Sequence, residues 1–108
     1  MAYEMEFVGE YEYAGEAEMR NAISSFNGSA SLSCSPITFE HLQKSGRRIR
    51  IEVTGSFPAT MYEAALGVLG ALSKHASGGA VEARWLSEEE SSVRVQAGMS
   101  EKEALQLF

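Results

Sequence analysis

The chain has 108 residues and a mass of 11.7 kDa, about the size of one compact domain spanning residues 1–108. Its 44% hydrophobic residues supply a core and exclude intrinsic disorder, and one cysteine excludes an internal disulfide and a four-cysteine zinc site. A net charge of −6, with no aspartate, disfavours binding to nucleic acid or anionic lipid. Because we see neither a membrane-length apolar run nor a basic signal segment, we expect a cytoplasmic protein.

The first 28 residues predict a strand followed by a helix. From Tyr3 to Tyr13, apolar residues at odd positions alternate with glutamates at even positions, which is typical of a strand with one buried face. Gly9, where the pattern loosens, suggests a bulge. Apolar residues then recur at helical spacing, and we expect a helix over about 16–26 that stops at Asn27-Gly28.

The segment 29–42 alternates weakly around Pro36, and we interpret it as two short strands or as one strand bent at the proline. A polar loop at 44–47 then predicts a hairpin, because Ile49, Ile51 and Val53 alternate with polar residues beyond it. Phe57-Pro58 should break that strand.

A second apolar helical stripe runs from Met61 to Ala76, with capping-box spacing over residues 60–63. Gly67 and Gly70 lie inside it, and we expect them to allow close packing against the sheet. Alternating segments at 81–86 and 93–97 then predict a second hairpin around Glu88-Glu89-Glu90. Ser100 and Glu103 have capping-box spacing again and predict a short tail helix.

The expected fold class is therefore α+β, with an antiparallel sheet that carries two helices on one face. The βαββαβ order over roughly residues 3–97 resembles a ferredoxin-like fold, with an extra C-terminal strand and the tail helix added. This resemblance concerns element order only and implies no function, because that fold hosts many unrelated activities.

The row of Glu4, Glu6, Glu10 and Glu12 is the most distinctive feature of the sequence. These carboxylates either bind a cationic partner or only solvate an open sheet face. Four arginines test the second interpretation, since a first strand placed between the other hairpins would make them cross-strand neighbours of the glutamates. They are Arg48, Arg50, Arg84 and Arg94.

Other candidate sites have simpler structural interpretations. A basic cluster near His41 could bind a phosphate group, and its members are Lys44, Arg47, Arg48 and Arg50. Because it has no exposed aromatic residues among its charges, we interpret it instead as a solvated hairpin tip. Cys34 and His41 could form a thiolate–imidazole pair, yet nothing in their spacing ensures contact, and we expect Cys34 to be a small buried apolar residue.

Neither histidine has the neighbours of a metal site, so we expect no metal and no cofactor. His75 is expected to interact with the negative end of the second helix, and Trp85 and the aromatic residues of the first strand to lie in the core.

The sequence therefore predicts a small acidic domain that binds another protein rather than an enzyme. We favour a stoichiometric inhibitor or escort, of the immunity-protein or secretion-chaperone type, whose partner has a basic surface. The candidate contact residues are those that the arginines leave least neutralised, namely Glu10, Glu12, Glu16 and Glu18. The alternative is a ferredoxin-like small-molecule binder or cofactor-free enzyme, with a pocket under the helices lined by Tyr11, Tyr13, His41 or Trp85.

The last strand, about 92–97, has no proline and no inward-facing charge to protect it at a sheet edge. Either the tail helix covers that edge or a second copy of the chain pairs with it, and we favour a homodimer.

Overall fold

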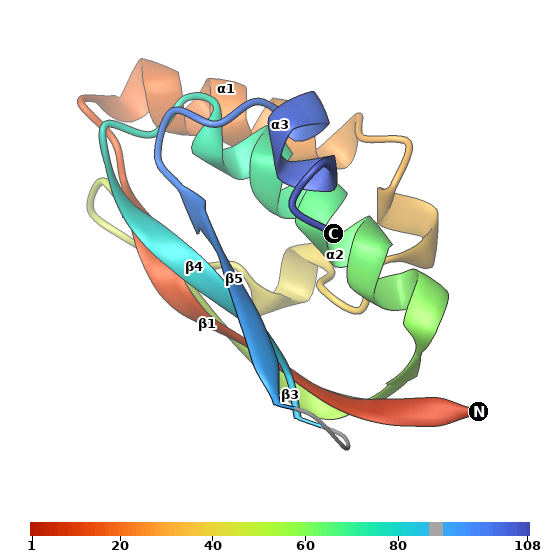
Figure 1. Cartoon of the computed structure of the whole chain (residues 1–108). Helices are drawn as coiled ribbons and strands as arrows, with labels where there is room; N and C mark the ends of the chain where they lie inside the picture. Colours follow the sequence, from red (N-terminus) through yellow and green to blue (C-terminus); the bar gives the residue numbers. More distant parts are fainter. Residues whose placement is uncertain (87–89) are drawn as a thin grey trace.

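The strand β1 (Ala2–Glu12) is the central strand of a five-stranded antiparallel sheet with the order β2-β3-β1-β4-β5. The computed structural model of the protein describes residues 1–86 and 90–108 (Figure 1). The other strands are β2 (Gln43–Ser45), β3 (Arg48–Pro58), β4 (Gly78–Trp85) and β5 (Ser91–Gln96). The expected α+β class and antiparallel sheet are confirmed, as is the position of the first strand between the two hairpins.

The strict alternation of β1 determines which side of the sheet is buried. Met5, Phe7 and Tyr11 are fully buried on one face, while the glutamates between them lie on the other face. The pairing of β1 with β3 continues without interruption from Ala2 opposite Pro58 to Glu12 opposite Arg48. The bulge predicted at Gly9 is therefore wrong, because Gly9 stays in register with both Ile51 and Val81.

The described residues form three α-helices on the same side of the sheet: α1 (Glu16–Asn27), α2 (Ala59–Ser73) and α3 (Glu101–Leu105) (Figure 1). The first and third helices agree with the expected ones, and the capping box of Ser100 and Glu103 is present. The capping box predicted at 60–63 is wrong, since α2 begins at Ala59 directly after β3 and has no side-chain cap. The strand β3 ends at Pro58, as the predicted break at Phe57-Pro58 requires, although both residues still belong to the strand. Pro58 has no N–H to continue the ladder.

The predicted strands over 29–42 are wrong. The segment instead forms two 3₁₀ turns, η1 (Leu32–Cys34) and η2 (Phe39–His41), and only the three residues of β2 join the sheet. Local side chains hold these turns: Ser29 Oγ accepts a hydrogen bond from Ser31 N, and Ser35 Oγ accepts one from Ile37 N. Short polar side chains compete in this way with ladder hydrogen bonds, and Pro36 has no N–H to contribute to a ladder.

The helix α2 is buried on almost every side because it lies between the sheet and the other helices. A Cβ atom at Gly70 would come within 2.6 Å of Glu101 Cα and 2.9 Å of Ala104 Cβ, and one at Gly67 would meet the Ser31 side chain. The glycines therefore allow close packing of α3 and η1 on α2, not packing against the sheet as expected from the sequence.

Buried tyrosines connect the sheet to the elements around it. Tyr11 Oη donates to the Val95 carbonyl at 2.7 Å, Tyr13 Oη to the Leu72 carbonyl at 2.9 Å, and Tyr62 Oη to the Ala83 carbonyl at 2.8 Å. Burial raises the pKa of all three tyrosines above the ordinary value of 10.0. Their neutral forms are thus part of the folded state.

We expect Gly70→Ala to lower the free energy of unfolding by up to about 2 kcal/mol, measured by urea denaturation. Overpacking costs roughly 1–3 kcal/mol, which exceeds the gain of up to about 1 kcal/mol from alanine's helix propensity. The control is Gly28→Ala at the end of α1, where a Cβ meets nothing closer than 3.4 Å and the stability should be unchanged or slightly higher. A Gly70→Ala protein at least as stable as the original would contradict close packing of α3.

We also expect stability to fall at alkaline pH. Because the folded pKa of each buried tyrosine lies above its unfolded value near 10, the stabilisation is fully present below pH 10 and is lost as the pH rises above it. The slope should approach about 1.4 kcal/mol per pH unit for each tyrosine. Urea denaturation from pH 8 to 11 measures it, and Tyr11→Phe should make the decline shallower. An equal slope in that variant would exclude Tyr11 as a source.

Candidate functional site

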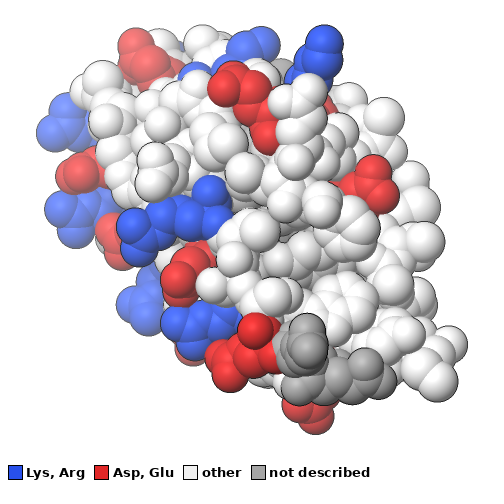
Figure 2. All heavy atoms as spheres, in the orientation of Figure 1, with Lys and Arg blue, Asp and Glu red and all other residues white. Residues whose placement is uncertain are grey.

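The face of the sheet opposite the helices carries charged side chains in rows. Its glutamates and arginines follow from the strand registers: Glu4, Glu6, Glu10, Glu12, Glu52 and Glu82, with Arg48, Arg50, Arg84 and Arg94. Figure 2 shows red and blue side chains alternating along the left of the molecule, where the sheet lies in Figure 1, while the right side is mostly uncharged. We call this uncovered surface the open face.

At one end of the open face, Arg48 connects two glutamates of β1. Its side chain lies 3.2 Å from Glu12 Oε1 and 3.8 Å from Glu10 Oε2. The arginine is about 60% exposed, so solvent screens both pairs. The premise that Glu10 and Glu12 escape neutralisation is therefore wrong in part, because one arginine compensates the two carboxylates together.

Arg84 has the same role on the other side of β1. It lies 2.9 Å from Glu82 Oε2 on its own strand and 3.3 Å from Glu6 Oε1 on β1. The hydrogen bond and negative charge of Glu82, with a smaller contribution from Glu6, raise the pKa of Arg84. Arg50 lies 3.5 Å from Glu52, and Arg94 is in register opposite Glu82. The expected cross-strand compensation of the β1 glutamates is thus borne out at Arg48 and Arg84 only, since Arg50 pairs with a glutamate of its own strand and Arg94 lies on β5, which does not neighbour β1.

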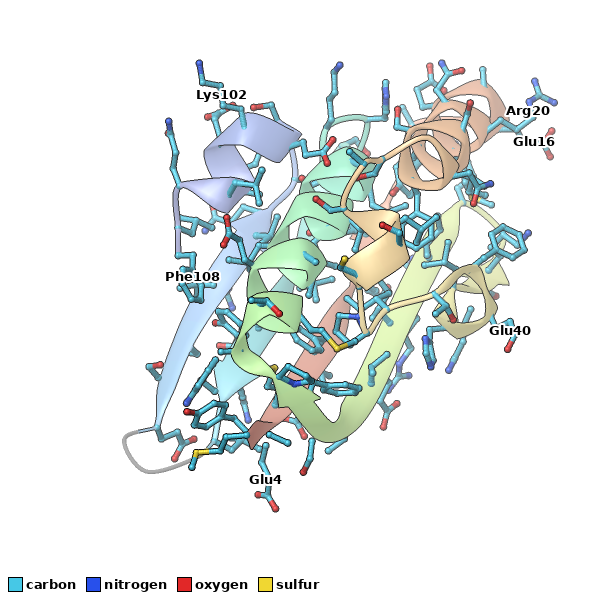
Figure 3. The ribbon with its side chains drawn as sticks, turned by 90° about the vertical axis from the view of Figure 1, so that its right-hand side faces the viewer. Glu4, Glu16, Arg20, Glu40, Lys102 and Phe108 are labelled. Carbon is cyan, nitrogen blue, oxygen red and sulfur yellow. The ribbon has the colours of Figure 1, made fainter. Side chains whose placement is uncertain are left out.

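Glu16 and Glu18 lie in the first turn of α1, immediately after β1. Both are exposed, and a Cβ on Gly15 would come within 2.9 Å of a Glu18 carboxylate oxygen. Acidic residues are favourable at a helix N-terminus, which here has no side-chain cap. Glu16 and Arg20 have i, i+4 spacing and lie at the same end of the molecule in Figure 3. These two glutamates belong to the helix that follows β1, on the other side of the sheet from the open face.

The basic cluster is divided among separate contacts. Arg47 Nη1 donates to the Ala14 carbonyl at 2.9 Å, which fixes the hairpin tip to the loop between β1 and α1. Lys44 Nζ lies 5.1 Å from the ring centre of Phe39, which is 45% exposed. The expectation that no exposed aromatic residue lies beside this cluster is therefore wrong, although the arginines face glutamates or backbone rather than one common ligand position.

Cys34 and His41 belong to different 3₁₀ turns and have different partners. His41 Nδ1 accepts a hydrogen bond from Thr38 N at 2.9 Å, and Cys34 Sγ lies 3.9 Å from Ser33 Oγ. Cys34 is exposed, contrary to the expected buried position, because its segment is a surface turn and not a strand. Among the described residues, no three His, Cys or Glu side chains are grouped so that they could hold a metal ion.

His75 lies just beyond the last turn of α2, and its Nε2 is 3.1 Å from Ser25 Oγ of α1. It therefore connects two helix ends in addition to lying near the negative end of α2. Trp85 is partly buried and packs on Tyr3 and Tyr62, with ring centres 4.7 Å and 5.4 Å away. Its predicted core role is confirmed in part, because the ring packs against the buried core but is not itself fully buried.

The surface hollows formed by the described residues include the following three, none of which was predicted from the sequence. One of about 530 Å³ lies where the ends of α1 and α2 meet α3, and includes Ser25, Lys74 and Lys102. A second of about 490 Å³ includes Arg94 and Gln96 on the open face, and a third of about 260 Å³ includes Cys34 and Glu63. None includes the side chains expected to line a pocket under the helices: Tyr11, Tyr13, His41 and Trp85.

Comparisons with known protein families, with curated proteins and with solved structures found no match to this chain. Across residues 1–86 and 90–108, no helix has the length and apolar character that crossing a membrane requires.

We expect Arg48→Ala to cost only about 0.2–1 kcal/mol in urea denaturation, because its two ion pairs are exposed and screened. The difference from the original protein should shrink further in 1 M NaCl. Arg47→Ala is the matched comparison at the neighbouring position, since its hydrogen bond to a backbone carbonyl is less sensitive to salt. A large, salt-independent cost at Arg48 would show that the pairs on the open face are needed for folding.

Proposed function

We propose that this protein is a small non-catalytic domain that binds another protein, whose surface is basic, through the open face of its sheet. The supporting observation is the excess of carboxylates there: among the described residues, six glutamates share the uncovered face with four arginines. The role we favour is a stoichiometric inhibitor or escort, of the immunity-protein or secretion-chaperone type, acting in the cytoplasm. Such proteins need no catalytic group, only a surface that attracts and fits one partner.

The glutamates that pair with arginines can still accept hydrogen bonds from a binding partner. The pair of Arg48 with Glu12 uses Oε1, and the pair of Arg84 with Glu82 uses Oε2. A carboxylate has two oxygens and about four lone-pair sites, so each can still accept hydrogen bonds from a bound cation. The arginines also restrict the side chains beforehand, which reduces the conformational entropy that binding must remove.

The contact region that we propose is Glu10 and Glu12 on β1 with Glu16 and Glu18 on α1. Only residues 13–15 separate the strand from the helix, so the two pairs of glutamates are close in the sequence. Arg48 lies among them, so a fitting partner has cations opposite the glutamates and an acceptor opposite that arginine. Such a mixed pattern discriminates between partners better than net charge alone, because a misplaced like charge is penalised.

We further propose that the architecture is ferredoxin-like, with β5 and α3 as additions. The strand order β2-β3-β1-β4 and the two longer helices on one face support this proposal. Function does not follow from it, since the same fold carries many activities.

The alternative proposal is a small-molecule binder or cofactor-free enzyme. The hollow among α1, α2 and α3 favours it, because about 530 Å³ is within the usual range for ligand pockets. Lys102, however, points away from the body of the molecule in Figure 3. The charged open face is therefore the better supported site.

The test reverses charge on the proposed contact region. We expect the variant E10K/E12K to remain folded, because exposed substitutions usually change stability by less than about 0.5 kcal/mol. The original and variant proteins, immobilised, are used to capture proteins from lysate of the native host, followed by quantitative mass spectrometry. One basic protein should be retained by the original and lost by E10K/E12K. With that protein purified, association should be about tenfold slower for the variant and less dependent on salt.

The matched control is E40K/E63K, which makes the same change in net charge at exposed glutamates on η2 and α2, away from the open face. It should retain the partner. Glu88-Glu89-Glu90, the predicted solvated turn, serves less well because Glu88 and Glu89 lie outside the described residues. A partner that is lost by E40K/E63K but kept by E10K/E12K would place the interface elsewhere.

A further inference from the structure

The outer edge of β5 carries backbone groups that no strand of the described chain pairs with. β5 is the last strand in the sheet order, and its neighbour is β4. Ala97 N donates to the Gly79 carbonyl at 3.0 Å, so N–H groups of odd-numbered residues point toward β4. The backbone groups of Ser92, Arg94 and Gln96 therefore point outward, away from the sheet.

This edge lacks the features that usually protect an edge strand. Residues 91–96 contain no proline, and the side chains facing the helices are Ser91, Val93 and Val95. The tail helix does not cover it: α3 packs on α2, and in Figure 1 no element crosses in front of β5. The opposite edge is better protected, because β2 has only three residues and includes Lys44.

Apolar surface continues from the edge on its helix side. Val93 is only partly buried, and Phe108 is 63% exposed. The Phe108 ring packs on Tyr62, whose hydroxyl donates to the carbonyl of Ala83, the residue opposite Val93. A chain that pairs with β5 would therefore also cover apolar side chains.

Charge restricts how a second copy of this chain can dock on this edge. Each copy has a net charge of −6, so two copies repel unless they meet where carboxylates are absent. β5 has one charged residue, Arg94, and that residue is basic. Two acidic molecules can therefore approach each other along this strand, where Arg94 of one copy can face a carboxylate of the other.

We propose that two copies pair antiparallel through β5 and form one continuous sheet of both chains. Outward backbone groups can pair only with outward groups, which limits the register. Placing Ser92 opposite the partner's Arg94 satisfies these groups reciprocally, keeps the two arginines from facing each other directly, and puts Val93 opposite its own counterpart on the two-fold axis. Glu90 then lies diagonally across from the partner's Arg94, on the same face. This pairing uses the β5 edge of the sheet, whereas the proposed partner contact uses glutamates of β1 and α1. The dimer proposal therefore does not depend on the proposed function.

The test combines mass with cross-linking. Sedimentation equilibrium should give twice the 11.7 kDa chain mass at micromolar concentration. In a Cys34→Ser background, Val93→Cys should form a disulfide-linked dimer, because a non-hydrogen-bonded pair brings Cα atoms to about 4.5 Å, within disulfide reach. Gln96→Cys is the control: the register separates it from its counterpart by about 20 Å, so it should stay uncross-linked.

Ser92→Pro provides the third variant. It removes an outward N–H without removing a β4–β5 hydrogen bond, so circular dichroism should be unchanged while the dimer dissociation constant rises at least tenfold. A single-chain mass at all concentrations overturns the proposal, even if β5 captures an unrelated extended peptide. Cross-linking of Gln96→Cys in place of Val93→Cys, or a Ser92→Pro protein that is folded and fully dimeric, also overturns it.

Discussion

The structure depends on the register of β1 between β3 and β4. Because the strand period is two, a slip of one residue would move Phe7 and Tyr11 to solvent and bring glutamates into the core. Gly9 helps to hold that register, since its φ of +154° and a Cβ position only 2.2 Å from the Ala80 carbonyl oxygen exclude any other residue. The same alternation that builds the core therefore also arranges the carboxylates in a row outside it.

Elements with a strong period could be predicted from the sequence. β1, α1 and the two hairpins follow from alternation or helical spacing that each segment carries by itself. The segment 29–42 could not be predicted, because its alternation is carried by small serines whose hydroxyls bond to nearby backbone, as Ser35 Oγ does with Ile37 N. Burial of Cys34 was inferred from a strand that does not exist, and its exposure follows from the turn.

The candidate site was predictable in its acidic half only. The row of glutamates can be recognised in the sequence of a single strand. Neutralisation of their charge, however, depends on which arginine lies beside which glutamate in the folded structure. Arg48 reaches both Glu10 and Glu12 because the β2–β3 hairpin places it at the end of β1, and only the register shows this. Likewise, the reason for Gly70 lies in residues more than thirty positions later, since Glu101 and Ala104 approach it from α3. Long-range contacts of this kind leave no local signal.

The two proposals have a joint consequence that follows from symmetry. Two sheets that pair edge to edge about an axis perpendicular to the sheet present their open faces on the same side, so both acidic regions of the dimer face one direction. Glu10 and Glu12 lie on the central strand, away from the β5 edge, and pairing therefore leaves them accessible. A partner that is itself dimeric, or that repeats a basic surface, would meet both regions at once, and bivalent contact can raise affinity by about 10²–10⁴ without any new contact. A weak individual interaction at an exposed, screened surface is then sufficient for tight binding, which is what a face made of solvent-exposed ion pairs requires.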